Sequence, residues 1–169
     1  MLNTRNSSRS LLSLMFLLLA GPAHAATVVC LGASNTYGKG VARTEAYPAQ
    51  LQTILKAKGS GATVANAGVN GNTTAQMLAR LDGVVSADTK VVLLQPGGND
   101  RRKGQGANRE GNIAAIQQRL ASRGIKVIML ENNMLQGKPH QSDNQHLTPD
   151  GYRMLAEEVV PKVSAALGK

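Results

Sequence analysis

Residues 90–100 read KVVLLQPGGND, in which an apolar run is followed directly by a glycine-rich loop. The first six of these residues form a short, mainly apolar run that predicts a strand over residues 90–95. A second run, TVVCL at residues 27–31, is almost continuously apolar, which is typical of a strand covered on both faces of a parallel sheet. A weaker run predicts a strand over residues 62–66, and another run predicts a strand over residues 125–130. The chain therefore has four candidate strands.

Stretches with helical periodicity separate these strands. Thr73 or Thr74 is suited to cap the second stretch, and Pro161 is expected to kink or split the last. Strands that alternate with helices indicate βαβ units. We therefore expect an α/β protein, a three-layer flavodoxin-like sandwich whose parallel sheet of about four strands has the order 2-1-3-4 and helices on both faces. The helical stretches are residues 47–55, 77–81, 113–120 and 148–163.

The N-terminal stretch has the pattern of an export signal. Two arginines precede an apolar run over residues 11–20, and AHA at residues 23–25 is the small-x-small pattern that a signal peptidase cuts after. Ten mainly apolar residues are too few to cross a hydrocarbon core about 30 Å thick. We therefore predict a signal peptide over residues 1–25, one domain over residues 26–169, and a periplasmic or secreted location without stable membrane insertion.

Charge and composition limit the classes of partner. The formal net charge of +9 becomes +7 once the arginines of the signal are removed, but the basic residues are scattered. The remaining chain has only three aromatic residues, all tyrosines, which are too few to stack bases. We expect a solvated basic surface and no nucleic-acid partner. Cys30 is the only cysteine, so it forms no internal disulfide, and we expect it to be a buried strand residue.

One polar or glycine residue of interest follows each of the four strands. Ser34, Gly71, Asn99 and His146 lie in the loops after the first, second, third and fourth strand. Ligands of such sheets bind beyond the carboxyl ends of the strands, so we expect these residues to converge at one edge. Acyl transfer by a serine needs a base, a group that orients the base, and donors for the oxyanion. This chain has candidates for each.

Each motif also has an ordinary structural interpretation. A single serine such as Ser34 more often lines or caps a turn. Asp143 precedes His146 by three residues, within reach of its imidazole, whereas His140 has no carboxylate at a similar spacing and ranks lower. The two glycines before Asn99 let the backbone approach a ligand, and the Asn99 amide can face a developing negative charge, although a tight turn would look the same.

Together, the four motifs resemble the four blocks of the SGNH, or GDSL-like, hydrolase family. The blocks correspond to residues 32–36, 68–74, 97–100 and 143–146, and GGND and the final DxxH are their specific parts. The resemblance spans essentially the whole chain after the signal. It implies a cofactor-free serine esterase that cleaves acyl esters through an acyl-enzyme intermediate.

The resemblance also assigns roles to individual residues. Ser34 would be the nucleophile, His146 its general base, and Asp143 the group that orients the imidazole. The oxyanion hole would consist of the Ser34 and Gly71 N–H groups and the Asn99 side chain. No metal cluster, P-loop or dinucleotide fingerprint stands out in the sequence, so neither a metal nor a cofactor is expected.

Two departures from the family pattern affect the expected substrate. Ala33 stands where the family usually has Asp in Gly-Asp-Ser, which removes an acidic neighbour of Ser34. Asn99 and His146 lie only 47 positions apart, which is shorter than is usual for the family. We therefore expect the fifth βα unit to be absent and one wall of the acyl site to be low. We therefore expect an open cleft that favours short acyl groups over long fatty chains.

The substrate is expected to be a small-molecule or glycan acyl ester, with Asn35, Arg101 and Arg102 as candidate binding residues. The basic run RRK at residues 101–103 could attract anionic substrates such as phospholipid head groups or acidic glycans, or be a solvated turn. Three alternatives stay open: a carbohydrate O-deacetylase, a lysophospholipase- or thioesterase-like enzyme, and a catalytically weak ligand-binding module on the same fold. The sequence leaves the oligomeric state open.

Overall fold

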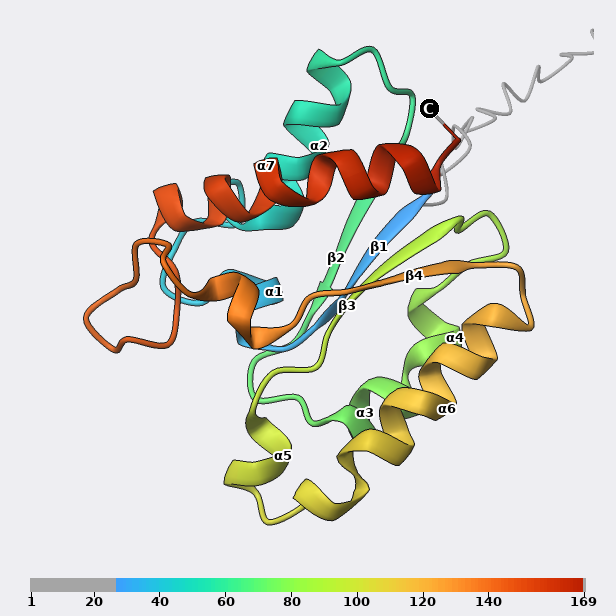
Figure 1. Ribbon diagram of the computed structural model, residues 1–169, viewed down its shortest axis with the longest axis vertical. Helices are drawn as coiled ribbons and strands as arrows, with labels where there is room; N and C mark the ends of the chain where they lie inside the picture. The colour runs from blue at the N-terminus through green and yellow to red at the C-terminus, as the bar shows by residue number, and fades with distance from the viewer. Residues whose placement is uncertain (1–26, 169) are drawn as a thin grey trace, which may run out of the picture.

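A computed structural model describes residues 27–168 and contains one parallel sheet (Figure 1). The predicted signal peptide lies outside the described residues. The strand order is β2-β1-β3-β4, so the predicted flavodoxin-like order is confirmed. The strands are β1 (Val28–Gly32), β2 (Val64–Gly68), β3 (Val91–Gln95) and β4 (Lys126–Met129).

The two strands with the strongest sequence signal are the two central ones. Every residue of β1 and β3 is buried, and Val28 of β1 is aligned with both Val64 of β2 and Val91 of β3. The edge strand β2 starts two residues later than predicted. The reason is that the Gln52 side chain binds the backbone around this point, donating to the Ala62 carbonyl and accepting from the Val64 N–H.

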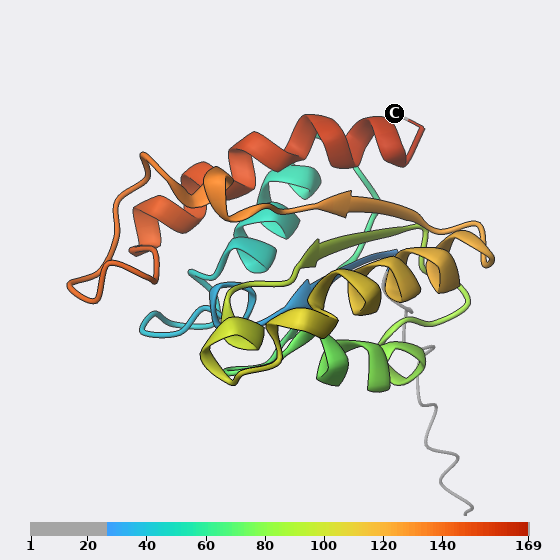
Figure 2. The same ribbon diagram turned by 60° about the horizontal axis from the view of Figure 1, so that its bottom comes forward.

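Helices cover both faces of the sheet, so the three-layer sandwich is also confirmed (Figures 1 and 2). One layer contains α2 (Tyr47–Ala57) and α7 (Pro149–Ala166). The other contains α3 (Thr74–Ala79), α4 (Leu81–Val84) and α6 (Arg109–Ala121). Four shorter elements complete the described chain: α1 (Ser34–Tyr37), α5 (Asn99–Arg102) and the 3₁₀ turns η1 (Gly106–Asn108) and η2 (Asn132–Leu135).

Each face of the sheet has its own apolar core. Alternate side chains of a strand point to opposite faces, so Val28 and Cys30 pack toward α2 and α7, while Val29 and Leu31 pack toward α3 and α6. Cys30 is fully buried, as predicted, and burial raises the pKa of its thiol to about 12. The thiol is therefore neutral and shielded at physiological pH.

The last helix is not split at Pro161. α7 begins after Thr148, whose side chain accepts from the Gly151 N–H, and continues through the proline to Ala166. Val159 and Val163 on either side of Pro161 are both fully buried in the core, which holds both halves of the helix against the sheet. Within residues 27–168, no helix combines the length and apolarity that a membrane crossing needs.

Candidate active site

The loop after β1 places Ser34 at the carboxyl edge of the sheet. Ser34 is the first residue of α1 and directly follows Ala33, which is buried and gives this short helix no side-chain cap. α1 packs closely on the end of β2. A Cβ atom at Gly68 would lie 2.1 Å from the Tyr37 backbone nitrogen, so glycine at this position allows the close approach that fixes the Ser34 turn.

Ser34, His146 and Asp143 form one hydrogen-bonded chain, although Ser34 and His146 are 112 residues apart. The Ser34 Oγ lies 2.8 Å from the His146 Nε2, and the His146 Nδ1 lies 2.5 Å from the Asp143 Oδ2. The hydrogen bond from the His146 ring, with further bonds from the His146 and Gln145 N–H groups, holds the pKa of the Asp143 carboxyl well below its usual range.

This arrangement decides which ring nitrogen carries the proton. An ionised carboxylate can only accept, so the Asp143 side chain receives the Nδ1–H of His146. The Nε2 atom is then left unprotonated and accepts from the Ser34 hydroxyl. A serine activated by an oriented imidazole is the arrangement that acyl transfer requires.

The loop that carries His146 is held by α1 and α7. The Asn35 Nδ2 donates to the Gln145 carbonyl over 3.0 Å, and the Tyr152 hydroxyl donates to the Asn35 Oδ1 over 3.0 Å. Both ends of the Asn35 amide are therefore engaged with protein groups. Asn35 lies at the cavity, but its hydrogen bonds position the histidine loop.

Gly71 and Asn99 lie at the same cavity as Ser34. Both line a cavity of about 260 Å³ together with Ser34 and His146. Gly71 has a φ of 74°, in the left-handed region that favours glycine. The Asn99 Nδ2 donates to the Asn72 carbonyl over 2.8 Å, which engages one of its two N–H groups and leaves the other for a ligand.

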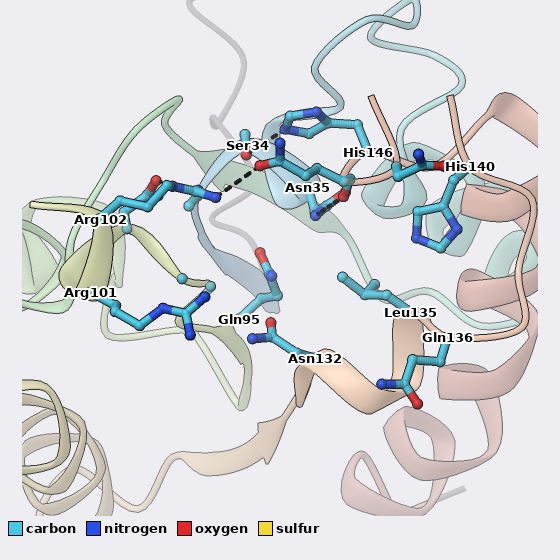
Figure 3. Close-up of a pocket in the computed structure, with 16 residues that line it drawn as sticks. Ser34, Asn35, Gln95, Arg101, Arg102, Asn132, Leu135, Gln136, His140 and His146 are labelled. Atoms are coloured by element: carbon cyan, nitrogen blue, oxygen red, sulfur yellow. Dashed lines mark hydrogen bonds between the residues drawn. The ribbon is translucent and has the colours of Figure 1, made fainter. Parts of the chain in front are cut away.

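Arg102 fixes the other end of the Asn99 amide. One guanidinium nitrogen donates to the Asn99 Oδ1 over 2.7 Å, and another donates to the Gln145 Oε1 over 2.8 Å. Arg102 therefore ties the loop after β3 to the loop that precedes His146. Figure 3 shows a dashed hydrogen bond at the Arg102 guanidinium, close to Ser34.

Asp100 of the GGND motif has a structural role that the sequence did not reveal. Its carboxylate is fully buried and accepts from the Thr74 backbone N–H and from the Thr74 hydroxyl. Thr73 is the residue that caps α3, so Thr74 is free to make these bonds. Asp100 thus holds the Asn99 segment against the start of α3, next to the loop that contains Gly71.

Arg80 is a second functional neighbour that sequence reasoning missed. This half-buried guanidinium donates to the Gly32 and Ala67 carbonyls, at the ends of β1 and β2, and to the Asn72 Oδ1. Burial lowers its pKa. No local pattern marks this arginine, because its partners come from three separate segments.

Ser34 also lines a larger cavity of about 300 Å³ (Figure 3). Its walls are mainly polar. His140 lies at this cavity, but its Nδ1 is bonded to the Lys138 carbonyl at 2.7 Å, and it is His146 that contacts Ser34. The side chains that line the cavity beyond the serine and histidine include Gln95, Arg101, Arg102, Asn132, Leu135 and Gln136.

Known proteins resemble this chain in sequence and in fold. The model of the GDSL-like lipase/acylhydrolase family matches residues 30–161. Esterase TesA of Pseudomonas aeruginosa is 32% identical over 119 residues, which make up 69% of this chain and 59% of TesA. The match thus leaves about two fifths of that relative's length unpaired.

Solved structures share the fold. The psychrotrophic esterase EstA from Pseudoalteromonas sp. gives a TM-score of 0.72 at 17% identity, over 84% of this chain and 98% of that chain. The acetyl xylan esterase AlAXEase gives a TM-score of 0.55 at 25% identity, over 82% of this chain and 72% of that chain.

Proposed function

Because the chain belongs to the GDSL-like lipase/acylhydrolase family, we propose that it is a serine hydrolase that cleaves acyl esters. The observation that carries the proposal is the contact between the Ser34 Oγ and the His146 Nε2 at 2.8 Å, with Asp143 bonded to the other ring nitrogen. In this proposal Ser34 is the nucleophile, His146 the general base and Asp143 the group that orients the imidazole.

The first half of the reaction forms an acyl-enzyme. The Ser34 Oγ attacks the acyl carbon while His146 takes the hydroxyl proton, and the carbonyl oxygen becomes an oxyanion. The Ser34 and Gly71 N–H groups and the free N–H of the Asn99 amide would donate to that oxyanion. His146 then gives its proton to the departing alcohol oxygen. In the second half, water repeats the attack with His146 as base, which releases the acid and restores Ser34.

The cavity walls support a preference for short acyl groups. Burial of a methylene group is favourable by about 0.8 kcal/mol only where the surroundings are apolar. Here the larger cavity has Leu135 as its one large apolar side chain, and it is otherwise lined mainly by amides and cations. A long fatty chain would gain little from such a surface.

The setting of the reaction is also part of the proposal. The sequence over residues 1–25 favours export, so the substrate would be met in the periplasm or outside the cell. Small-molecule and glycan esters both fit a polar cavity that opens to solvent. A carbohydrate O-deacetylase would use the same groups on a different alcohol.

An ester panel tests the proposal. Aryl esters from acetyl to lauroyl, and an acetylated glycan, are hydrolysed by the wild type, Ser34→Ala and His146→Ala proteins. We expect turnover that is highest on acetyl to butyryl esters and is lost in both variants. A maximum on the lauroyl ester would contradict the short-chain preference, and turnover that survives in folded Ser34→Ala would contradict the hydrolase assignment. Faster turnover of the acetylated glycan than of the aryl acetate would favour the O-deacetylase.

A further inference from the structure

The charged side chains that line the larger cavity beside Ser34 are all positive. Arg101 and Arg102 are among its lining residues, and no carboxylate is. Asp100, which follows the lining residue Asn99, is buried against Thr74, and Asp143, which precedes the lining residue Asn144, binds the His146 ring. Cationic walls without a compensating anion produce a positive potential in the cavity. Such a cavity favours an anionic group on the substrate.

Arg101 is the cation without a partner at this site. Arg102 is bonded to Asn99 and Gln145, and the Lys103 ammonium donates to the Gly71 carbonyl. Within residues 27–168, the Arg101 guanidinium has neither an ion pair nor a hydrogen bond to the protein. Figure 3 shows its side chain extending into the cavity toward Asn132. Its five N–H donors therefore face the space that a substrate would occupy.

The position of Arg101 indicates that it would contact the acyl chain of the ester. In the tetrahedral intermediate, the oxyanion faces Gly71 and Asn99, and the leaving oxygen faces the His146 Nε2, which must protonate it. The remaining substituent of the acyl carbon must point away from both. In Figure 3, the cavity continues away from Ser34 and His146 toward Gln95, Asn132 and Arg101. The acyl chain would enter this part of the cavity.

We propose that the preferred acyl group ends in a carboxylate that binds Arg101, so that the substrates are hemiesters of short dicarboxylic acids. The inference rests on the proposed hydrolase function. A guanidinium matches a planar carboxylate with two parallel hydrogen bonds, and the Asn132 and Gln136 amides can add neutral donors. The chemistry is unchanged: water adds across the ester bond, the alcohol leaves with a proton from His146, and the terminal carboxylate takes no part. The products are the alcohol, a dicarboxylate and one proton.

A pair of esters of the same shape tests the inference. Benzyl hemisuccinate and benzyl succinamate differ only in a terminal carboxylate or amide, and both release benzyl alcohol, which chromatography measures. We expect kcat/KM to be about tenfold higher for the hemisuccinate in the wild type, the effect of one additional charge-assisted contact. In Arg101→Gln the ratio of the two values should fall to about one. Raising the salt concentration should also lower the wild-type ratio, because Arg101 is exposed.

The matched control is Arg153→Gln, which removes the same charge from α7. Arg153 is bonded to Glu157 and does not line the cavity, so we expect the ratio to stay at the wild-type value. A third ester, benzyl butyrate with a carboxylate on the benzyl ring, places the charge on the alcohol instead. Preference for this ester over benzyl butyrate, lost in Arg101→Gln, would overturn the assignment of Arg101 to the acyl chain.

Two further outcomes would overturn the inference. One is a hemisuccinate to succinamate ratio near one in a wild type whose hydrolysis of neutral esters depends on Ser34. The other is a high ratio that survives in Arg101→Gln. Failure of the hydrolase proposal itself has a different signature, since no ester would then be cleaved. Calorimetric titration with succinate tests carboxylate binding by Arg101 separately from hydrolysis by Ser34. We expect succinate to bind wild type and Ser34→Ala equally well and to bind Arg101→Gln about tenfold more weakly.

Discussion

Replacing Asn99 by alanine separates the chemistry of the site from the stability of the fold. The Asn99 side chain is only 6% exposed, and its amide plane is fixed by the bonds to Arg102 and to the Asn72 carbonyl. Its second N–H therefore has one defined direction, and water competes poorly for it. Loss of one such oxyanion donor typically lowers kcat by about 10²–10³, which corresponds to about 2.7–4 kcal/mol of transition-state stabilisation.

The stability cost of Asn99→Ala should be smaller. Arg102 is exposed and keeps its bond to Gln145, so the main loss is the donor to the Asn72 carbonyl. An unsatisfied buried carbonyl costs about 1–2 kcal/mol, which lowers Tm by roughly 3–7 °C in a domain of this size. At 25 °C the variant should be folded and nearly inactive.

The assay for Asn99→Ala is steady-state hydrolysis of an aryl acetate together with thermal unfolding followed by circular dichroism. The matched control is Asn66→Ala, which also removes an amide that bonds backbone groups, here the Tyr37 carbonyl and the Gly68 N–H, but outside both cavities. We expect the control to keep kcat within about threefold, because it removes no group that faces the oxyanion. A kcat for Asn99→Ala that falls less than tenfold, or only in proportion to unfolded protein, would contradict the role of Asn99 as an oxyanion donor.

Three other predictions address the surroundings of the site. Arg80→Met should lower the free energy of unfolding by about 2–3 kcal/mol in urea titrations, because two strand-end carbonyls and Asn72 lose their donor; an unchanged midpoint would contradict this. Cys30 should react with a thiol reagent only after denaturation, because burial raises its pKa to about 12; rapid labelling of the native protein would show that the core is open. The folded-state pKa of Asp143 is depressed, so its contribution to stability is complete above the ordinary aspartate pKa of about 3.9 and is lost only as pH falls toward the lower folded-state value. The melting temperature measured from pH 7 down to pH 2 checks this, and a loss of stability due to Asp143 that begins well above pH 5 would contradict it.

The central strands and the local motifs could be predicted from the sequence for clear physical reasons. β1 and β3 are buried on both faces, so their side chains are almost continuously apolar and easily recognised. Asp143 and His146 are three residues apart, and that spacing alone allows the bond between their side chains. The loops after parallel strands meet at one edge, which is why residues distant in sequence could be expected near Ser34.

The groups that hold the site together could not be predicted in this way. Asp100 binds Thr74 across 26 residues, and Arg80 binds the Gly32 carbonyl across 48, so neither pair leaves a periodic or local signal. β2 starts two residues later than predicted for a similar reason, because the Gln52 side chain of α2 binds the backbone at the start of that strand. Pro161 was expected to kink or split α7; the helix is not split, because buried side chains on either side of the proline hold it against the core.

Labelling by a fluorophosphonate, which reacts preferentially with a serine that an adjacent base has activated, tests the pairing of Ser34 and His146 directly. Intact-mass spectrometry should find one adduct per wild-type chain, located by peptide mapping on Ser34, and none on folded Ser34→Ala or His146→Ala. A folded wild type that takes up no label, or a Ser34→Ala protein that still does, would contradict the claim that Ser34 and His146 form a working nucleophile and base.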